Sequence, residues 1–134
     1  MSMSPEKQQS LAEEQEAEKT ILVVEDDTSI GELVVQTLAQ ETHYQAVLVS
    51  DGSQALHAIH VFKPNLFILD YRLPDMNGID LYDRLHTTKG LEDTPGIMIS
   101  ATLPKRELKQ RALVGISKPF ELSQLLDTVE KLVA

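Results

Sequence analysis

Short apolar runs alternate along the chain with segments in which apolar residues recur every three or four positions. The runs predict strands at 20–25 (TILVVE), 45–50 (QAVLVS), 66–70 (LFILD), 97–100 (IMIS) and 113–117 (LVGIS). The periodic segments predict helices from about Thr28 through Leu38, from Gly52 to Lys63, from Gly78 through Leu85, near 104–112, and at 122–132. Five strands alternating with five helices predict an α/β fold, a doubly wound five-stranded parallel sheet with helices on both faces.

Three of the predicted helix ends have local signals. Asp27 is expected to cap the first helix through its carboxylate. Asp51 and Gly52 turn the chain into the second helix, and Lys63-Pro64 is predicted to end it because a residue before proline avoids helical geometry.

Residues 1–18 differ from the rest of the chain. This stretch has only Met1, Met3 and Leu11 as large apolar groups, so it offers no face that could pack on a core. We interpret 1–18 as a polar, acidic N-terminal extension and 19–134 as a single domain, since a chain of 134 residues suffices for one core.

Charge and composition exclude several function classes. The net charge of -9, from 21 acidic and 12 basic residues, argues against nucleic-acid binding and against anionic membrane surfaces. With no cysteine, no signal peptide and no run of membrane-spanning length, the sequence predicts a cytoplasmic protein without disulfides.

Polar side chains stand where four of the predicted strands end. Glu25 and Asp26 follow the first strand, Asp70 ends the third, Ser100 ends the fourth, and Lys118 follows the fifth. In open parallel sheets the working groups gather beyond the carboxyl ends of the strands. We therefore expect these acids, the hydroxyl and the amine to meet in one cleft, with these strands as neighbours in the order 2-1-3-4-5.

Carboxylates this close need a counter-charge, and a hard divalent cation such as Mg²⁺ is an economical one. An aspartate beside Mg²⁺ and lysine is a competent nucleophile toward a phosphoryl group. The pattern thus predicts phosphoryl transfer to Asp70, with Ser100 and Lys118 contacting phosphoryl oxygens.

Four motifs, ILVVEDD, LDYRLPDMNG, ISAT and SKPF, occur in this order on the predicted elements. Over residues 20–133 they make the chain resemble the receiver domain of two-component response regulators. The resemblance implies the flavodoxin-like strand order 2-1-3-4-5 and an aspartate that accepts a phosphoryl group. It also implies a sensor histidine kinase or a histidine phosphotransfer protein as the donor.

The resemblance assigns a metal set and a phosphate set. Asp26 and Asp70 would bind Mg²⁺ directly, Arg72 through its backbone carbonyl, and Glu25 through water. Asp70 would be the phosphoacceptor.

Ser100 would take the place of the family's Ser or Thr that changes conformation, with the small Ala101 beside it. Lys118 would bind phosphate, and its peptide bond to Pro119 would be in the cis form usual in the family.

The chain departs from the family pattern in one region. Gly115 stands where the family usually has Tyr or Phe, and about four residues are missing between Ser100 and Lys118. We expect a short or displaced helix near 104–112, and a readout different from the usual coupling of Ser or Thr to an aromatic ring.

The leading hypothesis is a stand-alone phosphoacceptor receiver that is not a turnover enzyme. It would signal by protein contact, with a downstream target on the face formed by 104–112, 113–117 and the last helix. The alternatives are a degenerate receiver acting as an interaction module, a phosphate sink, and a haloacid-dehalogenase-like phosphohydrolase. A phosphohydrolase of this type needs a second aspartate at the position that Arg72 occupies here.

Two further groups have ordinary interpretations. The four histidines are scattered, which predicts surface side chains and no metal site. Lys105, Arg106, Lys109 and Arg111 predict a solvated helix face, with docking of an acidic partner as a second hypothesis.

Overall fold

Five parallel strands form one sheet in the order β2-β1-β3-β4-β5. The computed structural model describes residues 19–133, so the predicted extension 1–18 lies outside the described part and stays a prediction. The strands are β1 (Thr20–Val24), β2 (Gln45–Val49), β3 (Leu66–Asp70), β4 (Gly96–Ser100) and β5 (Val114–Ser117). The helices are α2 (Thr28–Glu41), α3 (Gly52–Ala58), α4 (Gly78–His86), α5 (Lys105–Arg111) and α6 (Leu122–Val133).

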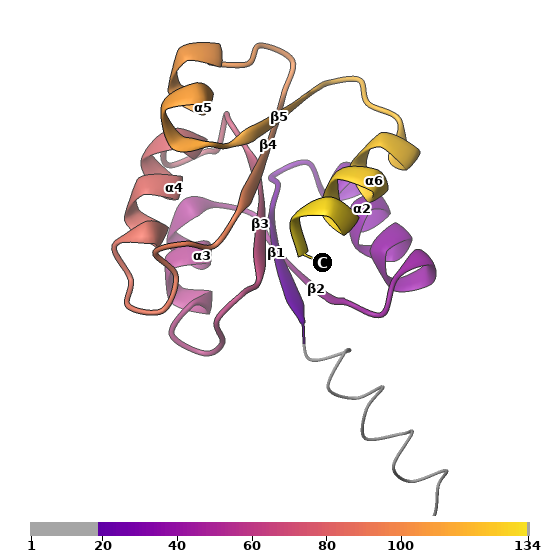
Figure 1. Cartoon of the computed structure of the whole chain (residues 1–134), viewed down its shortest axis with the longest axis horizontal. Helices are drawn as coiled ribbons and strands as arrows, with labels where there is room; N and C mark the ends of the chain where they lie inside the picture. Colours follow the sequence, from indigo (N-terminus) through magenta and orange to yellow (C-terminus); the bar gives the residue numbers. More distant parts are fainter. Residues whose placement is uncertain (1–18, 134) are drawn as a thin grey trace, which may run out of the picture.

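The sheet is covered on both faces. Helices α2 and α6 lie on one side of it and α3, α4 and α5 on the other (Figure 1). The middle strands β3 and β4 are buried along their whole length, whereas the edge strand β2 has no buried residue. This burial explains why the middle strands are continuous apolar runs. The predicted doubly wound fold and its strand order are confirmed.

Side-chain caps fix the starts of three helices. Asp27 accepts a hydrogen bond from the Ile30 amide at 3.2 Å and Asp51 accepts one from the Gln54 amide at 2.8 Å. Asn77 caps α4 in the same way. The predicted cap at Asp27 is thus confirmed, and Asp51, predicted to turn the chain into the second helix, also caps it.

Helix α3 ends earlier than predicted. It stops at Ala58, and the prediction that it would continue to Lys63 was wrong. After Ala58 the chain tightens, with the Val61 amide donating to the Ala58 carbonyl at 2.9 Å. The Lys63 ammonium donates to the Ile59 carbonyl at 2.8 Å. A side chain that satisfies a helix-end carbonyl in this way lets the helix finish before the proline forces it to.

One histidine does not follow the surface prediction. His86 is half-buried at the end of α4, and its ring nitrogens lie 2.7 Å from the Tyr82 carbonyl oxygen and 2.6 Å from that of Thr94. The ring also stacks on Tyr82, with centroids 3.8 Å apart. Helical periodicity could not reveal this because Thr94 reaches His86 only through the tertiary fold. The other three histidines, His43, His57 and His60, are exposed as predicted.

Within residues 19–133, no helix combines the length and apolar character needed to cross a membrane. The longest, α2, has 14 residues.

Candidate functional site

Two neighbouring strands deliver three carboxylates to one edge of the sheet. Strand β1 pairs with β3 so that Val24 lies beside Leu69. The residues that follow on each strand, Glu25 with Asp26 and Asp70, therefore come together. Their carboxylate oxygens lie within 4.8 Å of one another, and Glu25 and Asp70 are buried while Asp26 is exposed.

The next two strands add a hydroxyl and an amine. Strand β4 ends at Ser100, which is 3% exposed, and the Lys118 amide after β5 donates to the Ser100 carbonyl at 2.9 Å. Asp26, Asp70, Ser100 and Lys118 line a single pocket. All the residues predicted to meet at the strand ends thus do meet.

Lys118 bridges two of the three carboxylates. Its ammonium donates to Glu25 Oε1 at 2.9 Å and to Asp70 Oδ2 at 3.2 Å. Burial acts to lower the pKa of this amine, but the hydrogen bonds and charges of Glu25 and Asp70 raise it overall. The lysine therefore holds its charge, as a partner of buried acids should.

The same contacts do not keep Glu25 acidic. Burial and the neighbouring Asp70 carboxyl raise the pKa of Glu25 to about 7, against the lowering effect of Lys118. One ammonium shared by two buried carboxylates is insufficient counter-charge for both. The site therefore favours a further cation.

The chemistry of the donor set fits a hard divalent cation. Glu25, Asp26 and Asp70 supply only oxygen ligands, the type that Mg²⁺ prefers. Asp26 gives the cluster an exposed side through which hydrated metal can enter. Arg72 also lines the pocket, and its amide lies 3.4 Å from Asp70 Oδ1.

The loop after β3 is fixed by two features. A Cβ on Gly78 would lie 2.5 Å from the Asp70 carbonyl oxygen, so only glycine lets α4 begin this close to the end of β3. Asp75 accepts hydrogen bonds from the amides of Gly52 and Ser53, each at 2.9 Å. Asp75 lies in the LPDMNG motif, but sequence reasoning gave it no role, since its partners belong to α3.

The Lys118–Pro119 peptide bond is cis, as the resemblance implies. The expected departure in helix length is also present. Helix α5 is short, with seven residues, and Ala112 in a left-handed conformation with φ 55° leads the chain almost directly into β5.

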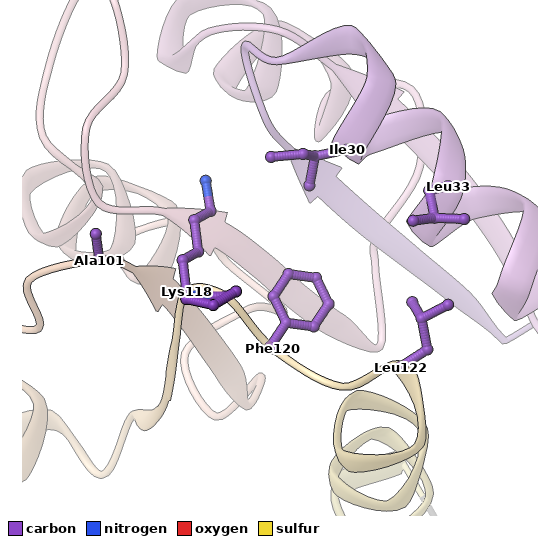
Figure 2. Close-up of a pocket in the computed structure, with 7 residues that line it drawn as sticks. Ile30, Leu33, Ala101, Lys118, Phe120 and Leu122 are labelled. Atoms are coloured by element: carbon purple, nitrogen blue, oxygen red, sulfur yellow. The ribbon is translucent and has the colours of Figure 1, made fainter.

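An apolar groove borders the pocket, and sequence reasoning did not foresee it. Ile30 and Leu33 of α2 face Phe120 and Leu122 across the groove (Figure 2). Leu33 belongs to the apolar repeat of this helix, yet its side chain is 48% exposed. The sequence signal for this groove was the apolar stripe of α2, which is wider than the core requires. Only Gly31, Val34 and Leu38 of this helix are buried.

Comparison with known proteins agrees with this geometry. A family profile described as "Response regulator receiver domain" matches residues 21–130. The DNA-binding response regulator MtrA of Mycobacterium tuberculosis is 35% identical over 113 residues, which cover 81% of this chain and 48% of MtrA. The phosphate regulon transcriptional regulatory protein PhoB of Pseudomonas aeruginosa gives the same identity and coverage. The chain thus spans about half the length of these curated relatives.

Solved structures show the same fold. The chemotaxis protein CheY4 of Vibrio cholerae superimposes with a TM-score of 0.79 at 28% identity, covering 87% of this chain and 99% of that one. A CheY-like receiver domain protein from Methanospirillum hungatei gives 0.78 at 26% identity, with 86% and 93% covered. The chain belongs to the response regulator receiver domain family. Receiver domains are signalling modules of two-component systems.

Proposed function

We propose that this chain accepts a phosphoryl group on Asp70 from a partner phosphohistidine. The observation that carries the proposal is the Lys118 ammonium, which bridges the buried carboxylates of Glu25 and Asp70 where β1 and β3 end. A buried aspartate at the mouth of a pocket, next to a cation and a hydroxyl, is arranged for nucleophilic attack rather than for a turn.

In the proposed step, an Asp70 carboxylate oxygen attacks the phosphorus. The O–P bond forms, the P–N bond to the donor imidazole breaks, and the departing nitrogen takes up a proton from solvent. Lys118 pairs with one phosphoryl oxygen, and the Ser100 hydroxyl donates to another. Asp26, Asp70 and the Arg72 carbonyl would hold Mg²⁺, with Glu25 acting through water. The bound ion would neutralise charge on the phosphoryl group.

The donor must present its phosphohistidine at the pocket, so it must also cover what surrounds the pocket. The apolar groove shares Ala101 and Lys118 with the pocket. This continuity supports a donor, a histidine kinase or a histidine phosphotransfer protein, that places the apolar side of a helix between α2 and Phe120. Output would then pass by protein contact.

The direct test is adduct formation. The protein is incubated with Mg²⁺ and either acetyl phosphate or beryllofluoride, and its intact mass is measured. We expect a single adduct on the wild type and none on Asp70→Asn, since an amide cannot serve as the nucleophile. Asp93→Asn, the same change at an exposed position away from the pocket, should label like the wild type.

An Asp70→Asn protein that still carries the full adduct would contradict the assignment of the acceptor. Absence of any adduct on the wild type would favour the degenerate receiver, an interaction module. Rapid turnover of general phosphate esters would favour a hydrolase, for which Arg72 supplies no acidic proton.

A further inference from the structure

Two leucines from outside β5 fill the space over Gly115. A Cβ on Gly115 would lie 2.7 Å from Leu108 Cδ1 and 3.0 Å from Leu103 Cδ1. Leu108 is a buried residue of α5, whereas Leu103 is half-buried in the loop between β4 and α5. Any side chain at position 115 would have to displace one of them. The space that a side chain at position 115 would take is thus filled by Leu108 of the helix together with Leu103 of the loop.

The loop that carries Leu103 is anchored to the candidate site by Ser100. The Ser100 hydroxyl donates to the Thr102 carbonyl at 3.0 Å and accepts from the Thr102 amide at 3.2 Å. Ser100 also lines the pocket around Asp70. A hydroxyl has one proton to donate. It therefore cannot donate to Thr102 and to a phosphoryl oxygen at the same time.

Helix α5 itself is held in place. Arg111 forms a bidentate ion pair with Asp83 of α4, with Nε to Oδ1 at 2.7 Å and Nη2 to Oδ2 at 2.9 Å. The Tyr82 hydroxyl donates to the Arg111 carbonyl at 3.2 Å. By contrast, Ala101 and Thr102 are exposed. A change that begins at Ser100 therefore meets less resistance in the loop than in the helix.

We propose that Leu103 changes its position in response to phosphorylation of Asp70 in this chain. When Ser100 donates to the phosphoryl group it releases the Thr102 carbonyl, and Leu103 leaves its position against Gly115. Gly115 has no side chain to follow, so the moving apolar group belongs to the loop instead of the strand. This inference rests on the proposed function of Asp70.

The test uses the full chain with ¹³C-methyl-labelled leucines. In the unmodified protein we expect a nuclear Overhauser effect between the Leu103 methyls and the Gly115 α-protons, which face each other in the structure. With Mg²⁺ and beryllofluoride this cross-peak should be lost. Intact mass on the same sample reports the adduct separately. A complete adduct with the cross-peak retained overturns the role of Leu103 alone, whereas no adduct on the wild type overturns the proposed function and this inference with it.

Truncation gives a second readout. Leu103→Ala should abolish the beryllofluoride-dependent change in amide exchange along β5 (Val114–Ser117). Leu56→Ala is the matched control, because Leu56 is half-buried against the same core from α3. It should keep the change. A Leu103→Ala protein with the wild-type change in β5 would overturn the inference.

Discussion

At the scale of single residues, Lys118 determines the electrostatics of the pocket. Its one positive charge is shared by Glu25 and Asp70 at 2.9 and 3.2 Å, while Asp26 adds a third carboxylate. The deficit of positive charge appears at Glu25, whose pKa is raised to about 7. The pocket is therefore built for an additional cation.

The raised pKa of Glu25 predicts a pH dependence of stability in metal-free protein. Between pH 4.5, the ordinary value, and about 7, the folded state binds a proton that the unfolded state does not. The resulting stabilisation is fully present below pH 4.5 and is lost as the pH rises through about 7. The free energy of unfolding, measured with urea, should fall by at most about 1.4 kcal/mol for each unit of rising pH across this window.

Glu25→Gln is the control for this slope, because its amide does not titrate and the decline from Glu25 should disappear. An identical decline in Glu25→Gln would assign the effect to other groups.

Residue types at strand ends were sufficient to name the groups that meet. Asp70, Ser100 and Lys118 each follow or end an apolar run, and parallel strands bring such ends together. The environment of each group was not predictable. That Glu25 is buried and Asp26 exposed depends on which way each side chain turns after β1 ends.

At the scale of elements, Asp75 links the loop after β3 to α3. Its two oxygens accept from the first amides of that helix, Gly52 and Ser53, which have no partner within the helix. The loop also contains Arg72, whose amide approaches Asp70. Asp75 therefore stabilises the segment that borders the pocket.

Replacing Asp75 by Asn should destabilise the protein by about 1 kcal/mol, because the side-chain amide keeps one acceptor oxygen but places an NH₂ donor against the other helix amide. The Gly52 amide lowers the pKa of Asp75, with a further contribution from Ser53. The stabilisation is therefore present above pH 3.8 and is lost as the pH falls through the lowered pKa. Chemical denaturation at pH 7 measures the effect. Asp127→Asn, the same change on the exposed face of α6, should stay close to the wild type, and an equal loss in both variants would contradict a specific role for Asp75.

Most elements were predictable, and the errors fall where tertiary contacts decide. The short α5 was expected from the missing residues before Lys118, whereas the early end of α3 was not. Its end depends on a turn and on the Lys63 side chain, which no periodicity records.

At the scale of the whole molecule, the pocket and the apolar groove form one continuous surface. The pocket opens at the carboxyl edge of the sheet, and the groove continues from Lys118 between α2 and α6. A partner that reaches Asp70 from this side must contact both. Under the proposed function, a small phosphodonor would need only the pocket.

This difference predicts that groove variants separate the two kinds of donor. Leu33→Ala should slow phosphoryl transfer from a phosphohistidine protein by about tenfold, the size expected for losing one apolar anchor of an interface. Labelling by acetyl phosphate should be unchanged because Leu33 lies outside the pocket. Transfer rates from a phosphorylated histidine phosphotransfer domain measure the effect.

Val61→Ala serves as the control, since Val61 is 83% exposed and lies away from the groove. Equal transfer rates for Leu33→Ala and Val61→Ala would place the donor elsewhere on the surface.

The sequence by itself determined the alternation of strands and helices, the strand ends that carry chemistry, and the anomaly at Gly115. These are local patterns, set by burial of apolar runs and by turn and cap residues. Only the tertiary structure decided that Lys118 bridges two carboxylates, that Leu33 stays exposed beside the pocket, and that Leu103 covers Gly115. Each of these depends on residues distant along the chain, or on which part of an apolar stripe the core leaves uncovered.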